Sequence, residues 1–190
     1  MGTVILDMSI SLDGFIAKPN GDDGGLNAWV FGGTHAVEAG EFTFQLTSEN
    51  SAKVFKDFVE RAGAFIVGKR AYTAAGAAPL FGLPTFILAN KDETATIDPD
   101  TLAHFVGNDI DDALAQAQKI AEEKAVYIFG GAHTAQQYLE AGLIDEIHLN
   151  HVPVMFTEGI RLFDNLTRSF DLDIVRVVEG VGVTHIVYRV

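Results

Sequence analysis

The chain has 190 residues, of which 48% are hydrophobic and 21% charged, so we expect one globular domain over residues 1–190. It contains no cysteine, which excludes disulfides, thiolate metal sites and cysteine nucleophiles. Its formal net charge of −13 repels nucleic-acid backbones and anionic membranes, so we expect neither as a partner. No basic segment precedes the first apolar run, and no apolar stretch approaches the length of about 20 residues that spans a bilayer. These features favour a cytoplasmic protein.

Short apolar runs predict strands, and apolar residues three or four positions apart predict helices. In chain order we expect a strand at 3–10, a turn at 11–14, a helix at about 51–62 capped by Gly63, a strand at 64–67, a short helix after Gly68, a strand at 85–88, a helix at 110–124 begun by Asp109, a strand at 126–129, a turn at Gly130–Gly131, a helix at 134–141 ended by Gly142, a strand at 144–154 and a hairpin over 172–190. This alternation implies an α/β fold with a mixed, mostly parallel sheet and an antiparallel C-terminal hairpin. The loops after Val67, Leu88 and Phe129 should then share the edge where α/β sheets bind ligands.

A glycine-rich turn joins a predicted strand to a predicted helix at residues 129–134. Glycines let the backbone approach a ligand closely, and a helix start offers N–H groups to an anion. Such a turn can hold a pyrophosphate, although it lacks the spacing of the dinucleotide-binding fingerprint. The alternative is a tight turn that needs glycine only for its geometry.

A second strand, glycine and helix sequence follows at residues 67–72. Lys69 and Arg70 form the only adjacent basic pair of this acidic chain. At a ligand-binding edge they could hold a terminal phosphate, such as the 2′-phosphate of NADP. The alternative is a solvated basic pair on an exposed helix.

Two other groups of residues carry weaker signals. Asp13 follows the first strand and could face a substrate, although Asp-Gly pairs more often mark a turn. His148 and His151 lie three positions apart on one predicted strand, where alternation points them to opposite faces, so we expect no metal site. The 14 phenylalanines are expected to be mainly core residues.

Several segments in order resemble the dihydrofolate reductase superfamily, in particular the branch of the C-terminal reductase domain of bacterial riboflavin biosynthesis. The segments are residues 11–17 (SLDGFIA), 67–72 (VGKRAY), 127–132 (YIFGGA), 138–146 (YLEAGLIDE), 152–154 (VPV), 159–163 (GIRLF) and 182–185 (GVTH). The similarity covers nearly the whole chain. It implies a three-layer α/β/α fold with NADPH bound along the carboxyl edge of the sheet.

The resemblance also implies roles for individual positions. Cofactor-binding residues would be Gly130, Gly131, Ala132, His133 and Thr134 at the pyrophosphate, Gly68, Lys69, Arg70 and Thr73 at the 2′-phosphate, Ala89 and Asn90 at the adenosine, and Ser9, Ile16 and Ala17 near the nicotinamide. Asp13 would face the substrate and orient it or relay a proton. Riboflavin-type reductases look dimeric through the terminal strands, which also suggests a homodimer here.

Three positions depart from the family pattern. Ala71 stands where the family usually has a threonine that helps to hold phosphate, and residues 156–159 (FTEG) replace a run of glycines. The pterin-binding acid of dihydrofolate reductases has no clear counterpart, although Glu38 or Glu41 could serve. We therefore expect an NADPH-dependent reductase of a small heterocyclic substrate, pteridine-like or ribosylaminopyrimidine-like. The alternative is a nucleotide-binding module with the same fold and no turnover.

Overall fold

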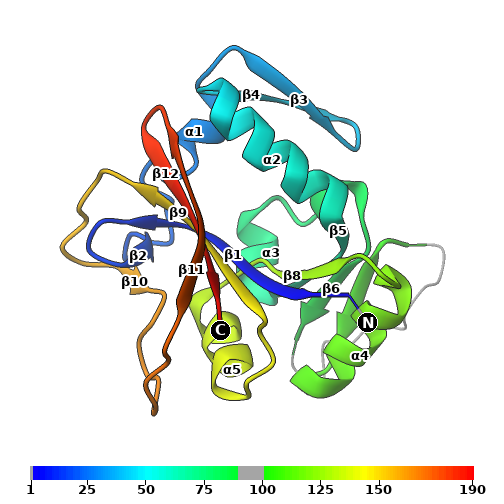
Figure 1. Cartoon of the computed structure of the whole chain (residues 1–190). Coiled ribbons are helices and arrows are strands. Elements are labelled where there is room, and N and C mark those ends of the chain that lie inside the picture. The colour runs from blue at the N-terminus through cyan, green and yellow to red at the C-terminus, as the bar shows by residue number, and fades with distance from the viewer. Residues whose placement is uncertain (1, 90–100) are drawn as a thin grey trace.

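A computed structural model describes residues 2–89 and 101–190 of the chain (Figure 1). Its main sheet consists of β1 (Val4–Ser11), β5 (Ala62–Gly68), β6 (Thr85–Leu88), β7 (Ala103–Val106), β8 (Ala125–Ile128), β9 (Glu146–Val152), β11 (Asp173–Gly180) and β12 (Val183–Arg189). The strands lie in the order β11-β12-β9-β1-β8-β5-β6-β7. All pairs from β9 to β7 are parallel, whereas β12 runs antiparallel to both of its neighbours. The mixed, mostly parallel sheet with an antiparallel C-terminal hairpin is thus confirmed.

Helices cover both faces of the sheet, as Figure 1 shows for α2 (Glu49–Arg61) on one side and for α4 (Ile110–Ala121) and α5 (Ala132–Glu140) on the other. Successive strand residues point to opposite faces. Leu6 therefore packs with the α4 and α5 side chains, and Ile5 packs with those of α2. The short helix α3 (Lys69–Ala74) rests on Val67 and Ile87 through Tyr72. The predicted three layers are confirmed.

The boundaries of helix α2 differ from the sequence prediction. Helix α2 begins at Glu49 because the Ser48 hydroxyl accepts the N–H of Ser51 at 3.1 Å and caps the first turn. The prediction that Gly63 caps this helix is wrong, since the chain passes from Arg61 directly into β5. A side chain at Gly63 would place its Cβ 2.7 Å from the Lys124 Cβ, so glycine is needed there for close packing.

Helix α4 differs from the prediction at its C-terminal end, and helix α5 differs at both ends. Helix α4 starts at Ile110 with the Asp109 carboxylate accepting the N–H groups of Asp111 and Asp112, as predicted, but it ends at Ala121 rather than Lys124. Helix α5 begins at Ala132, two residues earlier than expected, because Gly131 already has the extended backbone of a helix N-cap. The start of α5 therefore lies directly against the glycine turn.

Several short elements were not predicted. They are β2 (Phe15–Ala17), α1 (Ala28–Phe31), β3 (His35–Ala39), β4 (Phe42–Leu46), the 3₁₀ turn η1 (Leu80–Gly82), β7 and β10 (Ile160–Arg161). Strands β3 and β4 pair only with each other, in a hairpin turned at Gly40, and most of their side chains are exposed. Such strands lack the buried alternation by which a sequence reveals a strand.

The two C-terminal strands occupy different places in the sheet. The hairpin that they form lies at one side of the sheet, where β12 pairs with β11 on one side and with β9 on the other. Of these two strands, β11 is the one at the edge of the described sheet, and its residues Ile174, Val175 and Val177 are exposed. No helix in the described part of the chain is long and apolar enough to cross a bilayer.

Candidate active site

Three glycines meet at the carboxyl ends of β5 and β8. The Gly68 N–H donates to the Gly130 carbonyl oxygen at 2.9 Å. A Cβ on Gly68 would lie 2.8 Å from the Thr134 Oγ1, and Gly130 has a φ of 114°, which few other residues adopt. The carboxyl ends of β5, β6 and β8 therefore lie at one edge of the sheet, as predicted.

Helix α5 begins at this edge. Its N-cap, Gly131, has no side chain with which to satisfy the N–H groups of the first turn. Ala132 and Thr134 are buried and His133 is exposed. The nine-residue helix thus presents its N-terminus, with the positive end of its dipole, to the glycine turn.

Two cations begin helix α3 beside the same glycines. Lys69 is partly buried and Arg70 is exposed. The Ala71 methyl faces the turn, since a Cβ on Gly130 would lie 3.7 Å from it. The Thr73 hydroxyl donates to the Lys69 carbonyl oxygen at 3.0 Å, within its own helix. In this geometry the methyl at position 71, rather than the hydroxyl at position 73, is directed toward the glycine turn.

The remaining predicted cofactor residues lie in different surroundings. Ser9 lines the large cavity described below, whereas Ile16 packs against the core on the α4 and α5 face. Ala17 pairs with Ile160 between β2 and β10. Ala89 is buried, and its N–H donates to the Val106 carbonyl oxygen at 3.1 Å. Asn90 lies outside the described residues.

A cavity of about 520 Å³, here called the large cavity, opens beside β1 between α2, α1, the β3–β4 hairpin and η1. Most of its lining is aromatic or aliphatic: Met8, Trp29, Val30, Phe31, Phe42, Phe44, Val54, Phe55, Phe58, Ala75, Ala78, Pro79, Leu80, Phe81 and Phe129. Half of the 14 phenylalanines line this space, so the expectation that they are mainly core residues missed a second role. A flat apolar ring would fit such walls.

Phe81 is the centre of the aromatic wall. Its ring contacts those of Phe44, Phe58 and Phe129 with centroid distances of 5.5, 5.2 and 5.7 Å. Its backbone has a φ of 53°, a left-handed conformation that a bulky residue seldom adopts. Residues held in such a conformation are over-determined by their surroundings, and they often occur at binding sites.

Four polar residues complete the lining of the large cavity: Asp7, Ser9, Asn27 and Asn150. The Trp29 indole N–H donates to the Ser9 hydroxyl at 3.1 Å, which fixes one wall. Among the described residues that line the cavity there is no lysine, arginine or histidine. Asp7 is therefore the one charged group in that lining, and it is an acid.

A chain of hydrogen bonds runs from the start of α2 to this acid. The Ser51 hydroxyl bonds to the His185 Nε2 at 3.0 Å, and the His185 Nδ1 to the Asn150 Oδ1 at 2.7 Å. The Asn150 Nδ2 then donates to the Asp7 Oδ1 at 3.0 Å. A neutral His185 with its proton on Nδ1 satisfies every bond in this chain. Burial, followed by the nearby Arg176 charge, lowers the pKa of His185 to about 4, in agreement with that neutral form.

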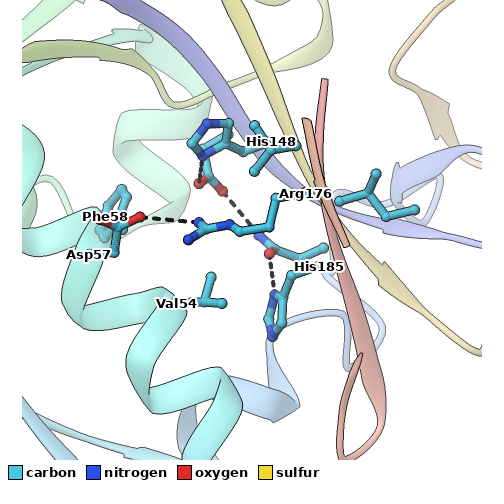
Figure 2. Close-up of a pocket in the computed structure, with 10 residues that line it drawn as sticks. Val54, Asp57, Phe58, His148, Arg176 and His185 are labelled. Carbon is cyan, nitrogen blue, oxygen red and sulfur yellow. Dashed lines mark hydrogen bonds and ion pairs between the residues drawn. The ribbon is translucent and has the colours of Figure 1, made fainter. Parts of the chain in front are cut away.

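The hydrogen-bonded residues Asp7 and Asn150 form the floor of the large cavity. A small cavity of about 10 Å³, close to the least space that one water needs, lies beside them. Figure 2 shows His148, Arg176 and His185 around it, with Arg176 bonded to Asp57 of α2. Asp7 lines both the large and the small cavity. It thus stands between the open space and a buried polar cluster.

Asp7 sits opposite His148 in the register of β1 and β9. The His148 Nδ1 lies 3.7 Å from the Asp7 Oδ2, and the His148 Nε2 bonds to the Glu146 Oε2 at 2.8 Å. Burial raises the pKa of Asp7 to about 6, although His148 and Asn150 partly oppose this shift. Burial also acts on Glu146, but hydrogen bonds from His148 and Arg61 outweigh it and lower the pKa of Glu146.

Asp13 has a different environment. Its carboxylate accepts the Ser11 hydroxyl at 2.6 Å and the N–H groups of Phe156 and Thr157 at 3.1 and 2.8 Å. The hydrogen bond from Ser11, and then those from the two backbone groups, lower the pKa of Asp13 to about 2 despite some opposing desolvation. Asp13 does not line the large cavity. The structure places its carboxylate against the 156–157 loop.

Sequence reasoning missed Asp7, His148 and Asn150 as members of a site. One signal could have found the first of them, because Asp7 is the one charged residue in β1, a strand at the centre of the sheet. A charge in that position needs partners. Those partners lie on β9, about 140 residues away in the sequence, and only the pairing of the strands identifies them.

Comparison with known proteins gives the family. A model of the RibD C-terminal domain matches residues 2–181. The chain belongs to the RibD C-terminal domain family. Among curated proteins, the uncharacterized protein YyaP of Bacillus subtilis (strain 168) is 24% identical over 205 residues, which cover 98% of this chain and 94% of YyaP.

Solved structures share the fold. A protein of Shewanella sp. PV-4 assigned by its name to riboflavin biosynthesis has a TM-score of 0.71 and 20% identity, with 98% of each chain covered. Dihydrofolate reductase from Enterococcus faecalis, complexed with NADP(H), has a TM-score of 0.64 and 20% identity over 99% of this chain and 96% of that one. A deaminase/5-amino-6-(5-phosphoribosylamino)uracil reductase of Thermotoga maritima has a TM-score of 0.66 and 12% identity, and this chain spans 56% of it. The predicted superfamily and branch are confirmed.

Proposed function

We propose that the protein is an NADPH-dependent reductase of a small, unphosphorylated heterocyclic substrate. Support for the reductase class comes from membership in a family of reductase domains and from the likeness of the fold to dihydrofolate reductase. The single observation that carries the proposal is the position of a large aromatic cavity next to the glycine turn and the N-terminus of α5. A reductase of this kind must hold a planar substrate beside a planar cofactor ring.

The residues at the glycine edge fit a dinucleotide. Gly68, Gly130 and Gly131 leave space that a Cβ would fill, and the α5 N-terminus offers N–H groups to a pyrophosphate. Lys69 and Arg70 would bind the 2′-phosphate that distinguishes NADPH from NADH. When bound, the nicotinamide supplies a hydride. The protein holds the two partners in position and keeps water out of the aromatic cavity.

The lining of the large cavity favours an uncharged ring as the substrate. Phosphate groups are held in proteins by cations or by clusters of N–H groups. The described lining residues include no cation, and Asp7 would repel a phosphate. In the Phe156–Gly159 segment, which replaces a run of glycines, the backbone N–H groups of Phe156 and Thr157 donate to the Asp13 carboxylate. A pteridine-like substrate therefore suits this site better than a phosphoribosylated one.

Two measurements test the proposal. Calorimetry or fluorescence should detect NADPH binding, and stopped-flow measurements should detect NADPH oxidation with at least one member of a panel of unphosphorylated pterins, pyrimidines and dicarbonyls. No binding at millimolar NADPH would refute the cofactor assignment. Binding without oxidation of NADPH by any panel member would instead favour a nucleotide-binding module.

A further inference from the structure

We propose that Asp7 is the acid of this site: it donates the proton that a C=N or C=O group requires on reduction, and it regains a proton through His148 and Glu146. This inference rests on the proposed reductase function. It assigns to Asp7, on β1, the proton transfer that the sequence analysis expected of Asp13. Three observations carry it.

The first observation is position. Asp7 is the one ionisable side chain that lines the described part of the large cavity. Its side chain is 14% exposed, so it reaches the cavity while most of its surface is away from water. Asn150, which also lines the cavity, fixes the Asp7 Oδ1 at 3.0 Å. The other oxygen, Oδ2, accepts no hydrogen bond within the described structure, and His148 lies 3.7 Å from it.

The second observation is a set of ionisable groups that leads from Asp7 toward solvent. The His148 Nδ1 faces the Asp7 Oδ2, and its Nε2 bonds to the Glu146 Oε2 at 2.8 Å. The Glu146 side chain is 25% exposed and is paired with Arg61 at 3.1 Å. An imidazole between two carboxylates can take a proton on one nitrogen and release one from the other. A small movement of either side chain closes the gap to Asp7.

The third observation is the electrostatic environment. Charged and titratable groups surround Asp7 from five elements: Glu146 and His148 on β9, Tyr127 on β8, Asp57 and Arg61 on α2, Arg176 on β11 and His185 on β12. Arg61 and Arg176 are each engaged by another acid, Glu146 and Asp57 respectively. Burial consequently dominates, and it raises the pKa of Asp7 to about 6, near the range that suits a general acid.

The chemical step balances with these groups. A hydride adds to the carbon of the C=N or C=O bond, and the π electron pair moves to the nitrogen or oxygen. That atom takes the proton of the Asp7 carboxyl, whose O–H bond breaks to leave a carboxylate. His148 then returns a proton to Asp7 and receives one from solvent on the Glu146 side. One NADPH and one proton are consumed for each substrate reduced.

The first test needs no substrate. Carbon-13 NMR of the aspartate carboxyl carbons should show one group in the wild type that titrates well above the others. Asp7→Asn should remove this titration, and the control Asp111→Asn, at the exposed start of α4, should keep it. Because His148 lowers the Asp7 pKa, His148→Gln should move the midpoint upward. The inference is overturned if every aspartate of the wild type titrates at ordinary values.

The second test uses single-turnover NADPH oxidation with whichever panel member the wild type reduces. Asp7→Asn should slow this step by about 100-fold or more and remove its dependence on pH, while NADPH affinity stays within about twofold. The control Asp111→Asn, which changes an exposed acid at the start of α4, should keep the wild-type pH profile. Wild-type turnover by Asp7→Asn overturns only this inference, whereas failure of the wild type to bind or oxidise NADPH overturns the reductase proposal and this inference with it.

Discussion

The two halves of the candidate site are built from different materials. The glycine edge at β5 and β8 is made of backbone, and what matters there is the absence of side chains at Gly68, Gly130 and Gly131. The large cavity is made of side chains, with an aromatic wall and a floor held by hydrogen bonds between distant strands. A backbone site tolerates little change in shape, whereas a side-chain site can change its chemistry through single substitutions.

The largest effect of a substitution is expected beside the glycine edge, at the two cations that begin α3. Double replacement of Lys69 and Arg70 by alanine should weaken NADPH binding by about 2–4 kcal/mol, since each charged hydrogen bond contributes about 1.5–3 kcal/mol with some overlap. NADH binding should change little, because NADH has no 2′-phosphate. Calorimetric titration with both cofactors checks this. Equal losses for the two cofactors would show that these cations do not read the 2′-phosphate.

The cavity floor should respond to pH in a way that the glycine edge does not. Because the pKa of Asp7 rises from 3.8 to about 6 on folding, the folded protein retains a proton that the unfolded chain loses between these values. The resulting stability is present below the unfolded pKa and is lost as pH rises through the folded one. Asp7→Asn should therefore raise the unfolding free energy by about 1–3 kcal/mol near pH 7.5 and change it little near pH 3.5.

Urea unfolding of the wild type and Asp7→Asn at both pH values measures this effect. The control, Asp111→Asn, removes an exposed carboxylate at the start of α4, so it should lack the gain at high pH. A gain for Asp7→Asn that is equal at both pH values would contradict the proposed buried carboxyl.

A smaller effect is expected when a single methyl group is added to the backbone of the glycine edge. Gly68→Ala should cost about 1–2 kcal/mol of stability and weaken NADPH binding, because the new Cβ would lie 2.8 Å from the Thr134 Oγ1. The matched control is Gly107→Ala, where nothing lies within 4 Å of the new Cβ. Thermal unfolding and cofactor titration of the two variants test this difference. Equal behaviour would mean that the α5 start can move away from β5 without cost.

Substitutions in β11, at the edge of the sheet, are expected to have the smallest effect on the glycine edge and on the large cavity. We propose that the exposed face of β11 forms the contact of a homodimer. Ile174 and Val177 are 66% and 57% exposed there, and within the described residues the strand pairs with β12 on one side alone. Light scattering at micromolar concentration should give twice the 20.5 kDa of one chain. Val177→Lys should reduce this mass and leave NADPH binding unchanged. A wild-type mass of one chain would refute the dimer.

Much of the architecture could be predicted from the sequence because it depends on local patterns. Buried parallel strands appear as apolar runs. Asp109 caps α4 by accepting hydrogen bonds from residues two and three positions further along the chain. The glycines after β5 and β8 indicate tight turns whatever the tertiary structure around them. The family resemblance added an order to these segments. The glycine edge was therefore found from residues that are close together in the sequence.

Only the tertiary structure decided where the chemistry of the cavity lies. Asp7 lies within the first strand and Asp13 in the turn that follows it, and the local sequence does not show the partners of either carboxyl. The backbone N–H groups of the 156–157 loop make Asp13 a structural acceptor with a pKa lowered to about 2. Burial against β9 instead keeps a proton on Asp7 up to a pKa of about 6. These opposite outcomes depend on the solvent exposure of each carboxyl and on contacts made across more than 100 residues of chain, which a sequence pattern does not contain.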